Sequence, residues 1–387
     1  MKTKNIFLFI PFSFLPFSPL LTFLSSIILL LFSSKLTYNK ERIILSLFCI
    51  YSLLFIVASR SYIDELEHDL SHYYLVYKSL GDGNIYELFG FGNGLEIGWP
   101  ILYGSISFFF PNLTPIGIAI INSSICCILF LIWLEKYGYA FFHCKNKSIA
   151  AAFVFTFLSV QTFGYLERQA ISTVFILFAI STNKYKSLVY TILATSFHLT
   201  AIPLVILYKL TLSRYTTQVK LLSFFIIIII FRLFYQSILG NLFIFKEILP
   251  VLGKLNYYII TFNDFKITSY RFMILVFPLL LSILFLLRKE KETYHIHKFI
   301  AVNSFLYISF IGIPLLPERI NFSLLYLYGL FVYFLFYKNY KELTFFFLII
   351  YILFFILEKT NILNNGINQF WVRYPIIDLS PFYYFTF

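Results

Sequence analysis

The chain has 387 residues, of which 60% are hydrophobic and 12% are charged, and its formal net charge is +12. A soluble globular domain carries about a quarter charged residues, so this composition excludes that class and indicates a protein of the lipid bilayer. The lysines and arginines gather in short connectors between apolar runs. This distribution is a topology signal, and it argues against a nucleic-acid partner.

The apolar runs are continuous and do not alternate with polar residues, which predicts helices and not a membrane β-barrel. We therefore expect an all-α, polytopic integral membrane bundle of roughly 10–12 segments, some of them re-entrant or broken, that forms one domain over residues 1–387. The predicted spans are Ile6–Phe32, Ile43–Ala58, Trp99–Phe110, Ile116–Leu134, Ile149–Phe163, Ala170–Thr182, Leu188–Leu207, Leu221–Leu239, Phe272–Leu287, Phe299–Ile313, Ile320–Phe336 and Phe345–Leu357.

Basic residues assign the two sides of the membrane, because connectors rich in lysine and arginine stay in the cytoplasm. The connectors that we place there are Lys35–Arg42, Lys136–Lys147, Asn183–Lys186, Arg288–Lys298 and Tyr337–Lys341. Segments 59–98 and 241–271 and the tail 358–387 then lie on the outer side.

The segment Ser59–Gly98 is polar and acidic, with carboxylates at Asp64, Glu65, Glu67, Asp69 and Glu96. Within it, apolar residues recur at helical spacing at Leu66, Leu70, Tyr73, Tyr74 and Tyr77. A polar stripe of Glu65, Asp69 and His72 runs beside them, which predicts an amphipathic helix at the outer interface. The polar stripe is either a solvated face or a functional one.

Two spans do not fit a simple crossing. Leu188–Leu207 has basic connectors at both ends, so we expect it to break near His198 and Pro203 and to form a hairpin of half-helices lining a polar cavity. That break would bring His198 to the outer acidic segment. Trp99–Phe110 is too short to cross, so either it is re-entrant or the charge rule fails there.

Ionisable residues at the outer ends of the spans are candidates for binding, because a charge at the membrane is energetically costly. Arg168 precedes the span that begins at Ala170, and Arg319 precedes another. Each has a plain alternative: Arg168 can snorkel or pair with Glu167, Arg319 can pair with Glu318, and His198 can be a packing residue. Together they form a candidate site for an anionic, lipid-linked substrate.

Several short motifs follow one another in a characteristic order. They are Arg60 with Asp64, Asp69-Leu-Ser-His-Tyr-Tyr74 with Tyr77, Gly94-Leu-Glu-Ile-Gly98-Trp-Pro, Glu167-Arg-Gln-Ala170, Ser196-Phe-His-Leu-Thr-Ala201 and Glu318-Arg319. In this order and spacing the chain resembles the EpsG-type and Wzy-type bacterial polysaccharide polymerases over roughly residues 55–210.

The resemblance implies a multi-pass protein of the bacterial inner membrane, active at the periplasmic face. Such a glycosyltransferase polymerises undecaprenyl-diphosphate-linked repeat units of an O-antigen of lipopolysaccharide, a capsule or an exopolysaccharide. The implied partners are that lipid-linked glycan, the bilayer and, as a candidate, a chain-length regulator protein. A lipid-linked glycan flippase is the alternative, although long outer segments favour the polymerase.

The transfer needs a base for the acceptor hydroxyl and cations for the departing diphosphate. Asp69, Glu96 and His198 are the base candidates, and the sequence does not rank them. Arg168 and Arg319 suit the diphosphate because a guanidinium binds phosphate oxygens in a bidentate way. The remaining candidates for substrate binding are Arg60, Gln169, Glu318, and Tyr73 and Tyr77, whose rings either stack on sugars or anchor the helix at the interface.

His68 and His72 stand four residues apart with Asp69 between them, which weakly echoes a zinc-protease motif. Asp69 replaces the glutamate of that motif, and no third ligand motif is evident, so a membrane zinc protease is a minor alternative. The four cysteines show no CxxC spacing. We expect neither a metal nor a cofactor.

Overall fold

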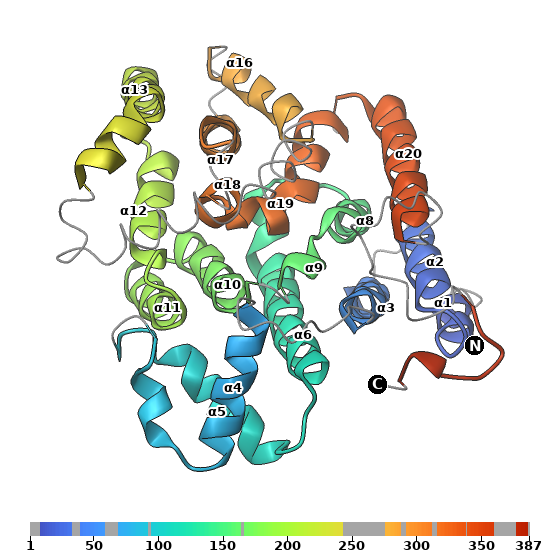
Figure 1. Cartoon of the computed structure of the whole chain (residues 1–387). Helices are drawn as coiled ribbons and strands as arrows, with labels where there is room; N and C mark the ends of the chain where they lie inside the picture. The colour runs from blue at the N-terminus through green and yellow to red at the C-terminus, as the bar shows by residue number, and fades with distance from the viewer. Residues whose placement is uncertain are drawn as a thin grey trace. The chain divides into compact units, whose positions relative to one another are not determined.

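A computed structural model describes residues 8–32, 39–58, 69–91, 94–163, 166–242, 275–287, 292–311, 316–337, 339–359 and 377–385. Within these ranges the chain forms helices joined by turns, and they contain no strand, which confirms the all-α prediction (Figure 1). The chain divides into two compact units, residues 1–202 with 325–387, and residues 203–324.

The helices of the first unit are α1 (Phe9–Phe14), α2 (Pro19–Phe32), α3 (Asn39–Ala58), α4 (Asp69–Gly81), η2 (Ile85–Phe89), α5 (Gly98–Phe109), α6 (Pro115–Trp133), η4 (Leu134–Gly138), α7 (Tyr139–Phe141), α8 (Lys147–Phe157), α9 (Val160–Phe163), α10 (Glu167–Ser181), α11 (Lys184–Phe197), η7 (Tyr333–Tyr337), α20 (Lys341–Lys359) and η8 (Tyr383–Phe385). The second unit contains α13 (Gln218–Leu242), η6 (Phe277–Leu281), α16 (Ser282–Leu287), α17 (Tyr294–Ser309) and α18 (Leu316–Ile320). The division falls within α12 (Ala201–Leu212) and α19 (Phe322–Val332).

Among the described residues, one continuous helical run is long and apolar enough to cross a membrane, Pro115–Phe141. It begins where the Thr114 hydroxyl accepts a hydrogen bond from the Gly117 amide at 3.1 Å, with proline in the first turn. It runs through α6, the π-helical turn η4 and α7. Other apolar helices, such as Lys147–Phe157, fall short of spanning length.

Large apolar side chains are nevertheless exposed along several helices. On α20, Leu343, Phe346 and Ile350 recur on one face and are exposed, and Leu188 and Ile192 do the same on α11. Contiguous exposed apolar surface is unfavourable in water and is stable against lipid tails. These faces are the ones that a bilayer would cover.

Contacts between helices define one end of the first unit. Arg42 of α3 forms a bidentate pair with Glu135 of η4, at 2.9 and 2.5 Å. Close to Glu135 in the chain, the Trp133 indole donates to the Leu177 carbonyl of α10 at 3.0 Å. At this end α6 and α10 finish and α3, α8 and α11 begin, so the basic connectors of the unit gather there.

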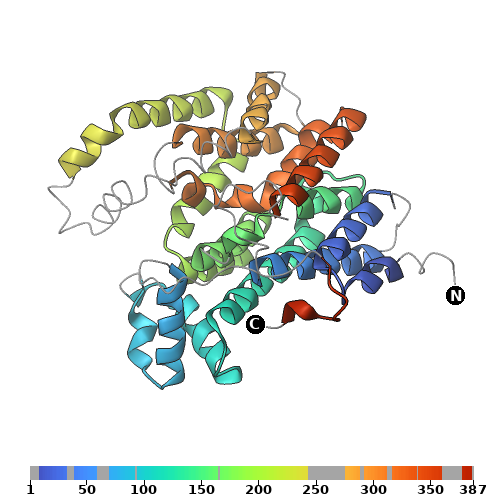
Figure 2. The same ribbon diagram turned by 45° about the vertical axis from the view of Figure 1, so that its right-hand side comes forward.

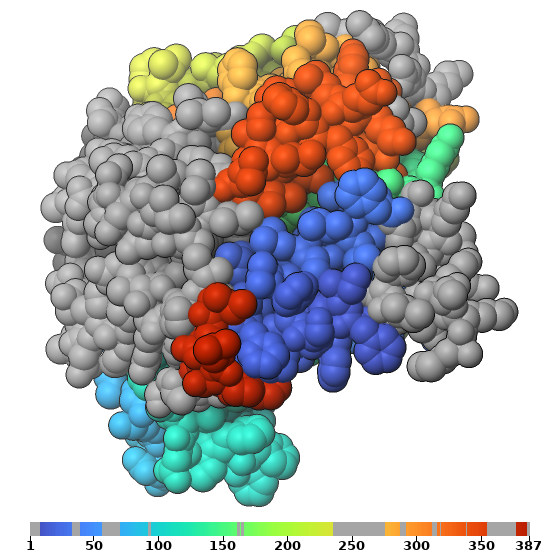
Figure 3. Space-filling model, turned by 90° about the vertical axis from the view of Figure 1, so that its right-hand side faces the viewer, coloured from blue at the N-terminus to red at the C-terminus, as the bar shows by residue number. Residues whose placement is uncertain are grey.

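The opposite end carries the C-terminal residues 377–385. The Asp378 and Phe382 amides donate to the carbonyls of Phe17 and Pro16, at 3.2 and 2.7 Å. The Tyr384 ring packs 4.4 Å from Phe55, near the last turn of α3. Figure 3 shows this C-terminal segment seated against α1 and α2.

Two predicted spans are interrupted in the structure. Ile6–Phe32 is divided into α1 and α2 by a turn that contains Pro16, whose missing amide cannot continue the helical hydrogen bonds. Ile149–Phe163 stops at Leu158, which adopts an extended conformation, before α9 begins. The amide of Ser159 is satisfied instead by the Leu325 carbonyl at 3.3 Å.

The predicted break in Leu188–Leu207 is confirmed. Helix α11 ends at Phe197, His198 is extended with φ −157° and ψ 125°, and α12 begins at Ala201. The hairpin of half-helices stays a prediction, since α12 lies mostly in the second unit.

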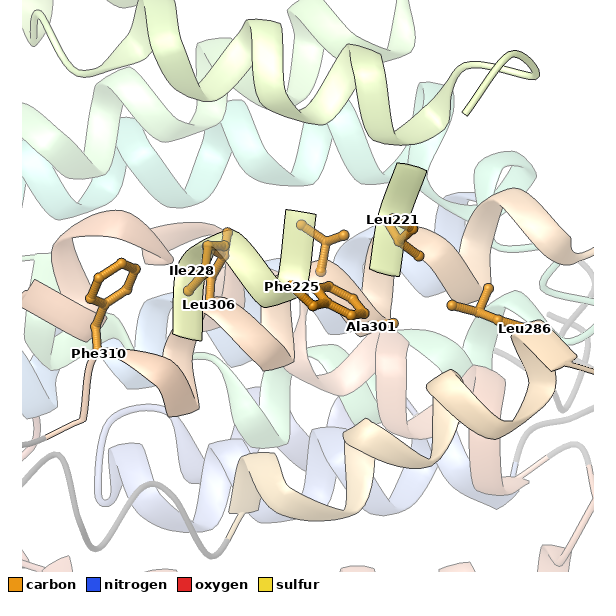
Figure 4. Close-up of a cluster of buried hydrophobic side chains, with 8 residues drawn as sticks. Leu221, Phe225, Ile228, Leu286, Ala301, Leu306 and Phe310 are labelled. Atoms are coloured by element: carbon orange, nitrogen blue, oxygen red, sulfur yellow. The ribbon is translucent and has the colours of Figure 1, made fainter. Parts of the chain in front are cut away.

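The second unit has its own apolar core between α13 and α17 (Figure 4). Leu221, Phe225 and Ile228 repeat at helical spacing on α13 and lie in one cluster with Leu306 and Phe310.

Candidate functional site

Helix α4 is the amphipathic helix that the sequence predicts. Leu70, Tyr73 and Tyr77 are buried, whereas His72 is exposed. The helix packs beside α5, with the Tyr73 and Trp99 rings 4.4 Å apart (Figures 1 and 2). The first turns of both helices therefore lie together.

The loop before α5 depends on two glycines. Gly94 has a φ of +82°, which a residue with a side chain rarely adopts, and its amide donates to the Phe91 carbonyl at 3.0 Å. A Cβ added at Gly98 would lie 3.1 Å from the Ser196 Cβ. Because Gly98 has no side chain, the start of α5 can approach the end of α11. This approach brings Glu96 to the break in the predicted broken span.

The Glu96 carboxylate joins three segments of the chain. Its Oε1 lies 2.8 Å from Nδ1 of His198 and accepts the Leu199 amide at 2.9 Å. Its Oε2 accepts a hydrogen bond from Nη1 of Arg168 and forms an ion pair with it. Arg168, His198 and Leu199 are 72, 102 and 103 residues from Glu96 in the chain, so the contacts exist only in the folded protein.

The side chain of Glu96 is only 4% exposed. Burial by itself would raise the pKa of this carboxyl, but the hydrogen bond and charge of His198, the charge of Arg168 and the Leu199 amide together lower that pKa to about 2. Glu96 is therefore an anion at neutral pH and a weak proton acceptor.

Arg168 lies in the first turn of α10. Its Nε donates to the Tyr73 hydroxyl at 3.2 Å, and its guanidinium lies 4.7 Å from the centroid of the Phe91 ring. The side chain is 22% exposed, so an anion from outside can reach it. Arg168 pairs with Glu96, whereas the Glu167 carboxylate accepts a hydrogen bond from the Tyr103 hydroxyl.

His198 is the residue that follows α11, and its side chain is 17% exposed. A hydrogen bond from Ser172 of α10 to the Ala194 carbonyl, at 2.9 Å, ties α11 to α10. Because Nδ1 faces the Glu96 carboxylate, the proton of a neutral imidazole sits on Nδ1, and Nε2 keeps its lone pair. This environment differs from that of a packing histidine among apolar neighbours.

The two candidate tyrosines are buried against protein. The Tyr77 hydroxyl donates to the Phe110 carbonyl and accepts the Leu113 amide at 3.2 Å, so this side chain fixes the turn before α6. Tyr73 lies between Trp99 and Arg168. These contacts favour the structural alternative over sugar stacking for both rings.

The other candidates lie beside the cluster in the chain, in the second unit or partly outside the described residues. Gln169 is buried next to Arg168 on α10, and Arg319 lies on α18 in the second unit. Asp69 is the first residue of α4. The remaining positions lie outside what the structure describes: the side chains of Asp69 and Glu318, the residues Arg60, Asp64 and His68, the segment 243–271 and the tail 360–376.

Sequence reasoning did not select Tyr103, Trp99 and Glu167 as site residues. Glu167 and Trp99 each stand inside a motif that the sequence does show, beside Arg168 and after Glu96. Tyr103 is four residues after Trp99, on the same face of α5. Helical spacing from Trp99 was the available signal.

The chain was also compared with known proteins. It matches no curated protein and no solved structure. The EpsG family model matches residues 43–376, a range that contains Glu96, Arg168 and His198. This chain therefore belongs to the EpsG family, a family of Wzy-like polysaccharide polymerases of the membrane.

Proposed function

We propose that the chain joins undecaprenyl-diphosphate-linked oligosaccharide repeat units into a polymer at the periplasmic face of the inner membrane, as a glycosyltransferase of O-antigen, capsule or exopolysaccharide synthesis. Membership of the EpsG family supports a polysaccharide polymerase. The observation that carries the finer proposal is the Arg168, Glu96 and His198 cluster, which combines a cation for phosphate with an oriented imidazole.

His198 is the proposed general base. Glu96 is hydrogen-bonded to Nδ1 of His198, so Nε2 can accept the proton of the acceptor hydroxyl. The Glu96 carboxylate then stabilises the imidazolium that forms. Glu96 itself is a poor base because its pKa is about 2. His198 is therefore ranked above Glu96 as the base.

Arg168 is the proposed diphosphate ligand. The acceptor oxygen forms a bond to the anomeric carbon of the donor, and the bond from that carbon to the diphosphate oxygen breaks. Undecaprenyl diphosphate leaves with the electron pair, and its negative charge is stabilised by the guanidinium. In the structure Arg168 pairs with Glu96, and the exposed 22% of its side chain is the part that a diphosphate reaches.

The position of the cluster supports activity on the outer side. Arg168 and Glu96 lie at the starts of α10 and α5, whereas the basic connectors of the first unit lie at the other ends of α10 and α6. If those connectors are cytoplasmic, the cluster faces the periplasm.

The test is to replace His198 by alanine in a strain that lacks the chromosomal gene. His198→Ala should abolish polymer and leave single repeat units on the lipid carrier, and His198→Gln should do the same because an amide accepts no proton. His143→Ala, which changes an exposed histidine in the connector before α8, is the control. Polymer of normal length in His198→Gln would refute the base assignment.

The same strain separates polymerase from flippase. Single units that accumulate on the outer leaflet of the His198→Ala strain support polymerisation as the missing step. Accumulation on the inner leaflet would instead identify a flippase.

A further inference from the structure

A second polar contact lies beside the proposed site and takes no part in the mechanism above. The hydroxyl of Tyr103, on α5, donates a hydrogen bond to Oε2 of Glu167, the first residue of α10. Both side chains are fully buried. A buried carboxylate is stable only when it is hydrogen-bonded, so this contact joins the two helices strongly.

An aromatic stack connects this contact to Arg168. The Trp99 ring lies 3.8 Å from the Tyr103 ring and 4.4 Å from the Tyr73 ring. Tyr73 in turn accepts a hydrogen bond from Arg168 at 3.2 Å. The stack is therefore attached to α10 at both ends, through the consecutive residues Glu167 and Arg168.

We propose that Tyr103 and Glu167 are a positioning pair that holds α5 in register with α10. Glu96 precedes Trp99 by three residues, so a fixed first turn of α5 sets where the Glu96 carboxylate meets Arg168 and His198. The pair orders the site without touching the substrate. Its consequence for catalysis rests on the proposed function, whereas its effect on the position of α5 does not.

The activity test uses three variants of the full chain and one matched control. Tyr103→Phe removes the donor, Glu167→Ala removes the acceptor, and Glu167→Gln keeps an acceptor oxygen of the same shape. Tyr208→Phe removes another buried tyrosine hydroxyl, which bonds to Ser323 at 2.8 Å in the second unit. Polymer is measured per molecule of membrane-inserted protein in the complemented deletion strain.

Tyr103→Phe and Glu167→Ala should each lower this activity about tenfold, the effect expected when a hydrogen bond to a charged group is lost. Glu167→Gln should retain most of it, and so should Tyr208→Phe. Wild-type activity in Tyr103→Phe would overturn the positioning role. Equal loss of activity in Glu167→Gln and Glu167→Ala would also overturn it, because activity would then depend on the charge of Glu167 and not on the hydrogen bond.

Trp99 provides a readout that is independent of the reaction. It is fully buried, and the chain has three tryptophans, so the background Trp133→Phe with Trp371→Phe leaves it as the sole indole fluorophore. In detergent-purified protein, acrylamide quenching of Trp99 should increase in Tyr103→Phe and stay unchanged in Tyr208→Phe. Unchanged quenching in both Tyr103→Phe and Glu167→Ala would refute the positioning pair. Increased quenching together with an active His198→Ala protein would refute only the proposed mechanism.

Discussion

Glu96→Gln is the most informative single substitution, because Glu96 links Arg168 and His198. The amide keeps the shape and can still accept the Leu199 amide, but it removes the ion pair with Arg168 and the anion that orients His198. We expect polymer synthesis to fall about 100-fold or more, as when an electrostatic partner of a catalytic group is lost.

The effect on stability can be estimated from the pKa of Glu96. A decrease from 4.5 to about 2 corresponds to about 3 kcal/mol, and solvent screening reduces this to about 1–3 kcal/mol at neutral pH. Because the folded-state pKa is the lower one, this stabilisation is fully present above pH 4.5 and is lost as the pH falls toward 2.

The assay compares the unfolding of purified wild-type and Glu96→Gln protein in detergent from pH 7 to pH 3. The difference in unfolding free energy should shrink as the pH falls below 4.5. Glu87→Gln, on η2 in the same segment 59–98, is the control and should keep wild-type polymer synthesis. A Glu96→Gln protein with wild-type polymer and wild-type stability would refute the reasoning about the cluster.

Three further predictions follow from the same geometry. Arg168→Lys should lose most of the activity that Arg168→Ala loses. The lysine ammonium is a point charge, so it cannot keep both the Tyr73 and the Glu96 contacts. Near-normal polymer length in the lysine variant would contradict this. Gly98→Ala should destabilise the protein by about 1–3 kcal/mol and reduce polymer synthesis. Adding Ser196→Gly to that variant should restore part of the stability and part of the synthesis. A Gly98→Ala protein with full activity would show that the close approach of α5 and α11 is dispensable. Asp82 and Lys145 are both exposed, and the native cysteines are buried, so a cysteine at either position reports its side of the membrane. In intact cells, an impermeant thiol reagent should label Asp82→Cys and not Lys145→Cys. The reverse pattern would show that the topology is inverted.

The sequence determined the helical class of the protein and many of the positions where its helices form. Apolar runs with few charges predict helices in lipid, and the match of the EpsG family to residues 43–376 agrees with the motifs that the sequence shows. The break at His198 was also predictable, because the basic residues on both sides of that span are a local property of the sequence.

Local patterns were less informative where a helix is interrupted without such a signal. The break at Leu158 depends on Leu325, which lies far along the chain. The carbonyl of Leu325 accepts a hydrogen bond from the Ser159 amide. Hydrophobicity alone does not distinguish a continuous apolar helix from an apolar run of two helices.

Only the tertiary structure decided which candidates meet. The sequence allowed Arg168 to pair with Glu167 and left three possible bases, whereas the folded chain pairs Arg168 with Glu96 and places His198 against the same carboxylate. These contacts depend on the close approach at Gly98 and on the packing of α5, α10 and α11, which join segments up to 102 residues apart. Helical periodicity acts over a few residues, so it fixes the face on which a side chain lies but not the partner that this face meets.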